Sequence, residues 1–245
     1  MRPRLLALWS APRCRSTAFL RMMTERGDFE VVHEPFSHVS NFGVAQVLDR
    51  EVHSEGELIE TLRQLARERC IFFKDTTDFH YERVLTHADF LREATHTFII
   101  RDPKAVIASH YSLNPGLQRD EIGFAWLYEI FRAVIEVTRA TPLVMDGDEL
   151  VAEPQKYVEA YCRHVDIPHI PEALNWHPGS LPAWERTARW HVAVSESRGM
   201  EPTTPRVDVD VAGDPVLGDY LRYHEPYYQR MRSVRLLPAL SQSGV

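Results

Sequence analysis

The sequence predicts an α/β fold of three layers, with a central parallel sheet of about five strands between two layers of helices. Short apolar runs alternate along the chain with segments of helical spacing, which is typical of parallel strands joined by right-handed crossovers. The apolar runs show no polar alternation, so both faces of each strand are expected to be buried. The 245 residues suffice for a large core, and we expect a single domain over residues 1–235 and a disordered tail at 236–245.

The first expected strand covers residues 5–9, with the sequence LLALW. Similar runs predict further strands at residues 29–33, 70–74, 95–100 and 142–145. The carboxyl ends of parallel strands meet at one edge of a sheet, where ligands bind. Polar pairs mark four of these ends: Pro12-Arg13, His33-Glu34, Lys74-Asp75 and Arg101-Asp102. This coincidence predicts a ligand site at that edge.

Helices are expected between the strands, at residues 16–23, 57–69, 81–91, 103–113, 121–139 and 154–165. Leu58 and Leu62, for example, follow helical spacing. Asp102 followed by Pro103 is typical of the start of a helix, because Asp is a good N-cap and Pro fits the first helical position. Residues 37–55 are polar and irregular, so we expect a loop there.

The charge of the chain is unevenly distributed. Its net value of −7 argues against a general nucleic-acid-binding protein. Residues 1–26 nevertheless hold six arginines and one acid, Glu25, which suggests a local anion site. The cysteines, Cys14, Cys70 and Cys162, show no disulfide or zinc spacing, so a reducing cytoplasm is expected. No apolar run approaches transmembrane length, and we expect no membrane partner.

A turn rich in Pro, Arg and Ser joins the first strand to the first helix, for which Ser16 and Thr17 are good N-cap types. Such a turn directs several backbone N–H groups to one point, where the helix dipole adds partial positive charge. Arg13 and Arg15 flank the turn and add full charges. We therefore expect an anion there, usually a phosphate. The alternative is an ordinary strand-to-helix turn with surface arginines.

This turn is not a Walker loop, because residues 10–17 contain neither the Gly nor the Lys of G-x-x-x-x-G-K-S/T. It resembles the 5′-phosphosulfate loop of sulfotransferases that use 3′-phosphoadenosine 5′-phosphosulfate (PAPS), whose pattern is roughly P-R/K-S-G-S/T-S/T. The resemblance is carried by Pro12, Arg13, Cys14, Arg15, Ser16 and Thr17. The sequence departs from the pattern at Cys14, and at Arg15, where the family usually has Gly.

A second motif involves Arg101, at the end of a strand, and Ser109, on the helix that follows. The Ser109 side chain is expected to lean back toward Arg101. A guanidinium and a hydroxyl together suit a phosphate dianion. The sulfotransferase family places an Arg and a Ser at this spacing to hold the 3′-phosphate of PAPS. A third, weaker element of the resemblance is Arg198-Gly199, a basic residue before a Gly.

The resemblance spans roughly residues 4–200. It implies a P-loop NTPase-like sulfotransferase fold, with PAPS as the donor and its bisphosphate remainder, PAP, as the product. Sulfuryl transfer needs a base for the acceptor's proton and cations for the charge on the leaving phosphate. Lys74 and Arg13 are the expected cations.

Several residues are candidates for the base. We favour Glu34, at a position that resembles the catalytic Glu of some bacterial members, and then Asp75. Either carboxylate could instead cap a helix or pair with a loop arginine. His33 and His80 are further candidates. Cys14 is a weaker candidate nucleophile, favoured only by its basic surroundings.

The leading hypothesis is a PAPS-dependent sulfotransferase acting on a hydroxyl or amine of a small molecule, with a homodimer as one expected form. A small-molecule kinase of related fold is an alternative, but the Walker Gly-Lys-Ser/Thr and a clear Walker-B Asp are missing. A non-catalytic nucleotide-binding or scaffolding protein is another, because Arg15 and Thr76 stand where the family usually has Gly and His. The histidines form no H-E-x-x-H motif, and no metal site is expected.

Overall fold

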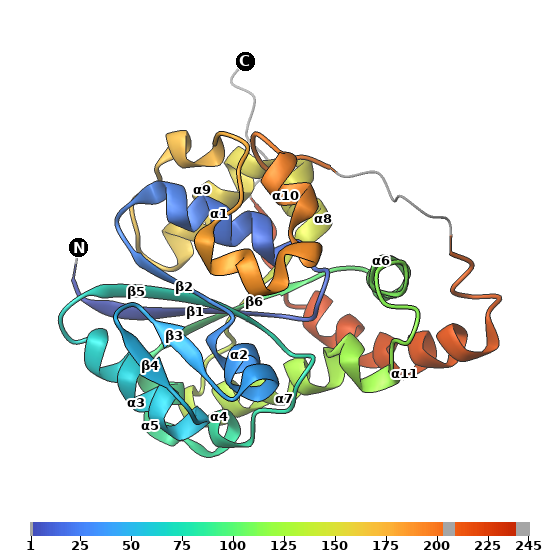
Figure 1. Ribbon diagram of the computed structural model, residues 1–245, viewed down its shortest axis with the longest axis horizontal. Helices are drawn as coiled ribbons and strands as arrows, with labels where there is room; N and C mark the ends of the chain where they lie inside the picture. Colours follow the sequence, from blue (N-terminus) through green and yellow to red (C-terminus); the bar gives the residue numbers. More distant parts are fainter. Residues whose placement is uncertain (1, 203–208, 239–245) are drawn as a thin grey trace.

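The computed structural model describes residues 2–202 and 209–238. Its centre is a sheet of five parallel strands in the order β2-β5-β1-β6-β7 (Figure 1). The strands are β1 (Arg4–Ser10), β2 (Glu30–His33), β5 (Cys70–Thr76), β6 (Thr95–Ile100) and β7 (Leu143–Asp146). The predicted fold class is therefore confirmed, and every expected strand is present.

The central strand, β1, is the first expected strand and pairs with β5 on one side and β6 on the other. Its residues Leu8 and Trp9 are fully buried, although their side chains point to opposite faces of the sheet. Helices must therefore cover both faces, as the unbroken apolar run predicts.

Figure 1 shows α1, α8, α9 and α10 on one face of the sheet and α3, α4, α5 and α7 on the other. The helices are α1 (Ser16–Arg26), α2 (Pro35–Phe42), α3 (Glu55–Leu65), α4 (Glu82–Thr86), α5 (Ala88–Glu93), α6 (Pro103–Tyr111), α7 (Phe124–Thr138), α8 (Gly147–Ala152), α9 (Pro154–His164), α10 (Val192–Glu196) and α11 (Pro215–Arg232). Short 3-10 helices are η1 (Arg119–Ile122), η2 (Pro171–Leu174) and η3 (Pro182–Trp190). Among the described residues, no helix combines the length and apolar character needed to cross a lipid bilayer.

The prediction of a loop at residues 37–55 is wrong. The segment contains most of α2 and a small antiparallel hairpin of β3 (Ala45–Val47) and β4 (Arg50–Val52). The inward side chains of Ala45, Val47 and Val52 are almost completely buried, so packing against the rest of the molecule stabilises the hairpin. Local sequence gave little sign of this, because each strand is only three residues long.

Other helices differ less from expectation. The helix expected at 81–91 is divided into α4 and α5 at His87, whose ring nitrogen Nδ1 accepts a hydrogen bond from the Phe90 backbone (3.2 Å). α6 begins as predicted, with the Asp102 carboxylate accepting from the Ala105 backbone N–H (3.1 Å).

Near the C-terminus, the Leu236 N–H donates to the Val144 carbonyl (2.8 Å), so the expected tail begins attached to the sheet. The rest of that tail, residues 239–245, lies outside the described residues.

Candidate active site

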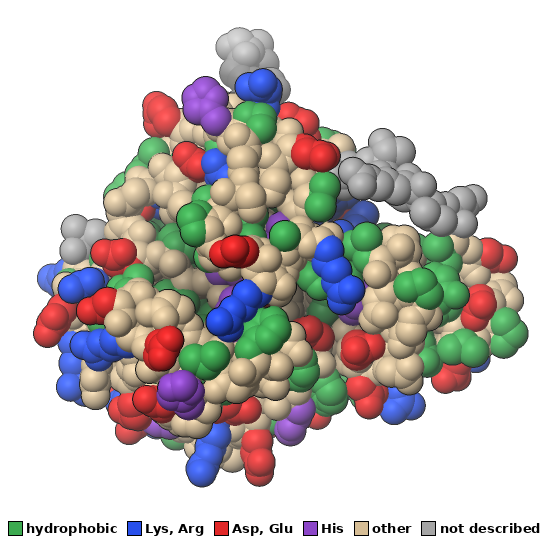
Figure 2. Space-filling view, viewed as in Figure 1, with side chains coloured by type: hydrophobic (Ala, Val, Ile, Leu, Met, Phe, Trp, Pro, Cys, Tyr) green, Lys and Arg blue, Asp and Glu red, His purple; other side chains and the backbone are tan. Residues whose placement is uncertain are grey.

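A cavity of about 860 Å³ lies at the carboxyl ends of the strands. Its walls come from the loop after β1, from α2, from the segment after β5, from α6 and from the η3–α10 segment. Figure 2 shows this face hollowed near its centre, where α2, α6 and α10 converge in Figure 1, with basic and hydrophobic side chains at the rim. The volume is at the upper end of the range for ligand pockets, so it has room for two substrates.

The loop between β1 and α1 has an unusual backbone. Arg13 and Arg15 both adopt left-handed conformations, with φ of 65° and 68°. Arg15, and not Ser16 or Thr17, occupies the N-cap position of α1, and its side chain makes no capping hydrogen bond. The expected N-cap is therefore wrong. The loop keeps at Arg15 a conformation that glycine adopts easily, at a cost of about 1–2 kcal/mol for a residue with a Cβ.

Ser16 and Thr17 instead begin α1 and line the cavity together with Pro12. The Ser10 hydroxyl donates to Ser16 Oγ (2.9 Å), which ties the end of β1 to the start of the helix. On the other side, a Cβ at Gly147 would lie 2.5 Å from the Cys14 carbonyl oxygen. α8 therefore packs directly against the loop, which requires glycine at this position.

Arg15 and Arg101 share one carboxylate, that of Asp148 on α8. Arg15 Nε donates to Asp148 Oδ1 (2.7 Å), and Arg101 Nε donates to both oxygens (3.0 and 3.1 Å). Burial opposes ionisation of this carboxyl, but the two guanidinium groups outweigh it and lower the pKa of Asp148. Asp148 is not among the residues predicted from the sequence motifs. Its position just after β7 is a fifth strand end, which was the available signal.

Arg13 reaches across the cavity to α6 and η3. Its Nε donates to Ser109 Oγ (3.1 Å) and a terminal nitrogen donates to the Trp190 carbonyl (2.8 Å). Arg101 and Ser109 also line the cavity, as their predicted pairing requires. Burial, together with the nearby Arg101 charge, lowers the pKa of Arg13 from its usual high value.

The third predicted element, Arg198-Gly199, is only partly at the site. Gly199 lines the cavity, but the Arg198 side chain is exposed and is not among the lining groups. The Arg198 main chain pairs with Trp176 instead, its carbonyl accepting a 3.0 Å hydrogen bond. Arg189 is the basic residue of this segment that lines the cavity, with its guanidinium 4.6 Å from the centre of the Trp190 ring.

Glu34 and Lys74 form a buried ion pair at the ends of β2 and β5. Lys74 Nζ donates to Glu34 Oε1, and the Glu34 N–H donates to the Lys74 carbonyl (2.7 Å). Burial opposes ionisation of Glu34, but the Lys74 ammonium and the neighbouring imidazoles outweigh it and lower the pKa of Glu34. Both side chains line the cavity.

Asp75, the second candidate base, has a different position. Its fully buried carboxylate accepts hydrogen bonds from the Phe36 N–H (2.6 Å), the Ser37 N–H (3.1 Å) and the Ser37 hydroxyl (2.6 Å). It therefore caps the first turn of α2 and is not among the groups that line the cavity. Burial raises the pKa of Asp75 to about 7, although the α2 donors oppose this shift. Of the two expected roles of Asp75, a base or a helix cap, the position of its carboxylate matches the helix cap.

Two other candidates lie away from the cavity wall. His80 is exposed, with Nε2 2.9 Å from Glu129 Oε2. The Cys14 thiol is fully buried, and burial raises its pKa far above the usual value. A nucleophilic Cys14 is therefore contradicted, because a buried thiol of raised pKa is unreactive.

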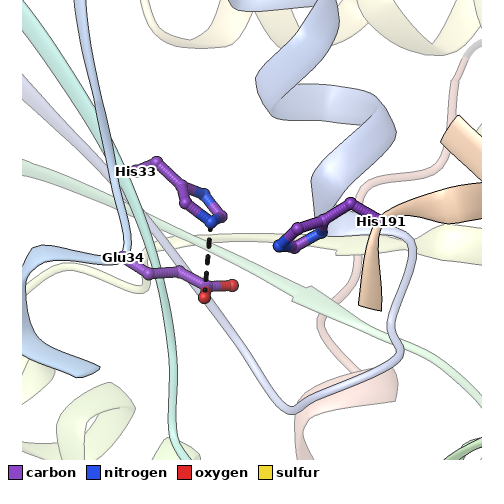
Figure 3. Close-up of side chains that lie close together, drawn as sticks. All are labelled: His33, Glu34 and His191. Atoms are coloured by element: carbon purple, nitrogen blue, oxygen red, sulfur yellow. Dashed lines mark ion pairs between the residues drawn. The ribbon is translucent and has the colours of Figure 1, made fainter. Parts of the chain in front are cut away.

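Two histidines border Glu34 (Figure 3). His33 Nε2 lies 3.5 Å from Glu34 Oε2, and the His191 ring lies 4.9 Å from the His33 ring, measured between centres. His191 follows η3 and lies within hydrogen-bond range of two threonine hydroxyls, Thr187 (3.0 Å) and Thr17 (3.4 Å). His33 is among the candidates predicted from the sequence, whereas His191 is not, because nothing in the local pattern brings that distant residue to the strand ends.

A family profile described as "Sulfotransferase domain" matches residues 4–235. The chain belongs to the sulfotransferase family. The match covers all five strands of the central sheet and the residues that line the cavity. The resemblance to this family is therefore not limited to the loop at residues 12–17 but includes nearly the whole chain. The family membership makes the protein a transferase by class.

Known structures share the fold. The sulfotransferase domain of the Synechococcus PCC 7002 olefin synthase superposes with a TM-score of 0.55 at 14% identity, covering 91% of this chain and 95% of that one. The sulfotransferase domain from the curacin biosynthetic pathway gives 0.52 at 15% identity, with coverages of 97% and 100%. A sulfotransferase from Alicyclobacillus acidocaldarius gives 0.52 at 12% identity, with 98% of both chains covered.

Two curated relatives come from Arabidopsis thaliana. Branched-chain-amino-acid aminotransferase-like protein 2 is 24% identical over 94% of this chain. Branched-chain-amino-acid aminotransferase-like protein 1 is 26% identical over 80% of this chain. The chain spans less than half the length of both, 43% and 36%. The likeness therefore concerns one part of those proteins.

Proposed function

We propose that this protein transfers a sulfuryl group from PAPS to a hydroxyl or amine of a small-molecule acceptor, with residues 1–235 acting as one domain. The observation that carries the proposal is the convergence of two basic regions on one cavity. The loop at residues 12–17 supplies one, and Arg101 with Ser109 supplies the other. A donor with anionic groups at both ends, such as PAPS, matches this arrangement.

The residues present fit such a donor. The start of α1 and Arg13 would hold the 5′-phosphosulfate, since a helix N-terminus and a guanidinium both favour anions. Arg101 and Ser109 would hold the 3′-phosphate. The hydrogen bonds from Arg101 to Asp148 use the Arg101 Nε atom, so the terminal nitrogens of the guanidinium can bind the phosphate.

Glu34 would act as the base. Its carboxylate lines the cavity, stays ionised because its pKa is lowered, and could take the acceptor's proton. The acceptor oxygen or nitrogen then forms its bond to sulfur as the bond from sulfur to the phosphate oxygen of PAP breaks. Lys74 and Arg13 would stabilise the negative charge on the transferring and leaving groups. Lys74 forms a hydrogen-bonded ion pair with Glu34, so the two side chains would act as a pair.

Apolar side chains in the wall of the cavity indicate the chemical character of the acceptor. Phe42, Leu113 and Val192 are each more than a third exposed and line the cavity from α2, from the turn after α6 and from α10. Apolar side chains left in water around a binding site usually contact an apolar ligand. We therefore propose an acceptor that combines its reacting hydroxyl or amine with an apolar part. A cytoplasmic location and a homodimer remain predictions.

The proposal is tested by titrating the protein with PAP, with PAPS and with ATP plus Mg²⁺, followed by a transfer assay with a panel of acceptors. A sulfotransferase binds PAP without metal and passes the sulfuryl group to at least one acceptor. Preference for ATP with Mg²⁺ would favour the kinase alternative. PAP binding without transfer to any acceptor would favour a nucleotide-binding or scaffolding protein.

A further inference from the structure

Three groups that can bind metal ions meet beside the proposed base. His33, Glu34 and His191 each offer one ligand atom, and these atoms lie within 4.8 Å of one another. Figure 3 shows both imidazole rings turned toward the Glu34 carboxylate. His33 and Glu34 come from the end of β2, whereas His191 comes from the junction of η3 and α10. The cluster therefore exists only when the η3–α10 segment is packed over the strand ends.

His33 is the unusual member. Its side chain is only 1% exposed, and neither ring nitrogen has a hydrogen-bond partner. A buried polar atom without a partner is costly, so an unpaired imidazole in a folded protein calls for an explanation. One such nitrogen, Nε2, faces Glu34 Oε2 at 3.5 Å. Its position next to a carboxylate oxygen and a second imidazole suits coordination of a cation.

The other two groups are oriented for the same purpose. Glu34 Oε1 accepts from Lys74, which fixes the carboxylate and leaves Oε2 facing His33. His191 has threonine hydroxyls near both ring nitrogens, those of Thr17 and Thr187. In metal sites, a ligating histidine usually makes a hydrogen bond through its second nitrogen, which orients the ring. Either threonine can supply that bond while the other nitrogen binds the ion.

We propose that His33, Glu34 and His191 bind a divalent transition-metal ion, of which Zn²⁺ is the best match, with a fourth position open to the cavity. Two imidazoles and one carboxylate suit zinc and related ions, whereas Mg²⁺ and Ca²⁺ prefer all-oxygen sites. Ligand bonds of about 2.1 Å in tetrahedral geometry place ligand atoms about 3.4 Å apart. The His33–Glu34 pair is already at that separation, so mainly His191 must move closer.

The neighbouring Lys74 sets the strength of the site. Its ammonium repels a dication and holds one oxygen of the carboxylate. Binding is therefore expected to be weaker than in a dedicated zinc site, and Lys74→Met should strengthen it. A metal-bound Glu34 cannot accept a proton, so the ion should inhibit sulfuryl transfer. This last consequence rests on the proposed function, whereas metal binding itself does not.

The test is a titration of the untagged protein with Co²⁺, followed by visible absorption, and with Zn²⁺, followed by calorimetry. We expect one equivalent of Co²⁺ to give the absorption of a four- or five-coordinate ion. His33→Gln and His191→Gln should each weaken binding roughly 100-fold, since even indirect ligand partners are worth 10–100-fold. Lys74→Met should tighten binding roughly tenfold or more. His80→Gln, which alters an exposed histidine outside the cavity, is the matched control and should change nothing.

Two results would overturn the site: no binding of either ion by the wild-type chain, or equal binding in wild type, His33→Gln and His191→Gln. The two histidine variants are read separately, so that misfolding of one leaves the other as the test, with circular dichroism as the check on folding. The transfer assay separates the two proposals. The assay is run on protein freed of metal with a chelator, because a bound ion is itself expected to inhibit transfer. A chain that binds metal but transfers no sulfuryl group when metal-free would leave the site intact and reject the proposed function, and transfer by a chain that binds no metal would do the reverse.

Discussion

Two carboxylate–cation clusters border the cavity, and they differ in their access to water. In the first, Asp148 lies between Arg15 and Arg101, and its side chain is 44% exposed. In the second, Glu34 pairs with Lys74, and their side chains are 11% and 2% exposed. The same chemistry therefore operates in two environments, one partly hydrated and one largely dry.

The difference has an energetic consequence. The Asp148 carboxylate is partly exposed, although the side chains of Arg15 and Arg101 are only 11% and 13% exposed. Replacing this carboxylate by a phosphate should therefore cost less than breaking a fully buried pair. A buried pair is different, because removing one partner leaves an unpaired charge in a dry site, at a cost of roughly 3–5 kcal/mol. The Asp148 cluster is suited to exchange of anions, and the Glu34 cluster to transfer of a proton within a fixed frame.

The largest expected effect comes from the dry cluster. Glu34→Gln should lower turnover by roughly 10²–10⁴, the range for loss of a general base, and change PAP affinity only a few fold. The amide oxygen can still accept from Lys74, which reduces the cost of leaving that ammonium without a counter-charge, and circular dichroism checks that the fold is retained. Single-turnover transfer and calorimetric titration with PAP measure the two quantities. Near wild-type turnover in Glu34→Gln would show that the acceptor needs no carboxylate here.

The partly hydrated cluster is tested by Arg101→Ala. Loss of a charge-assisted contact to the 3′-phosphate, worth about 1.5–3 kcal/mol, should weaken PAP binding roughly 10–100-fold. Arg198→Ala is the matched control, because its exposed side chain does not line the cavity, and PAP affinity should not change. The assignment of Arg101 fails if both variants bind PAP equally well.

Asp75 lies next to the Glu34–Lys74 cluster, and its carboxylate should affect the free energy of unfolding. Asp75→Asn places an amide among the donors of α2 and should destabilise the fold by about 1–3 kcal/mol in urea unfolding. The pKa of Asp75 is raised by burial to about 7, so the folded state holds the extra proton between about pH 4 and about pH 7. The wild-type contribution of Asp75 should therefore fall as pH rises through that window, and Asp75→Asn should remove the slope.

Asp75→Asn also serves as the control for Glu34→Gln. A large loss of turnover in a folded Asp75→Asn protein, with Glu34→Gln still active, would transfer the base role to Asp75. Loss of PAP affinity in both variants would mean that the two carboxylates hold the donor site in place.

Ser109 links the two ends of the donor site, since its hydroxyl faces the cavity and accepts from Arg13. Ser109→Ala should cost about 1 kcal/mol, or roughly fivefold in PAP affinity. Adenosine 5′-phosphosulfate, which lacks the 3′-phosphate, should be less affected. Equal weakening of both ligands would indicate that Ser109 acts through Arg13. Ser233→Ala, at the end of α11 and outside the cavity lining, is the control.

The smallest expected effect tests whether Asp148 competes with the donor. Asp148→Asn removes the negative charge between Arg15 and Arg101 and should tighten PAP binding by about 2–5-fold, in proportion to the weak energy of an exposed pair. Higher salt should reduce the difference. Weaker PAP binding in Asp148→Asn would show instead that the carboxylate is needed mainly to hold the arginines in place.

Local sequence by itself determined the order of the five strands of the central sheet and most of the helices between them, the turn at residues 12–17 and the start of α6 at Asp102. Each of these depends on neighbouring residues: an apolar run, a cap, or a proline that fixes its own backbone. The positions of Glu34, Lys74 and Arg101 at one edge of the sheet also followed, because parallel strands end at the same edge.

Only the tertiary structure decided the partners of those residues. Asp148 reaches the site from α8, and His191 reaches it from the junction of η3 and α10. The hairpin of β3 and β4 is stabilised by packing against distant residues. Asp75 and Glu34 look alike in sequence, each beside the end of a strand, yet one caps α2 and the other faces the cavity. Their roles depend on which donors surround each carboxylate and how much water reaches it, and both depend on contacts between residues far apart along the chain.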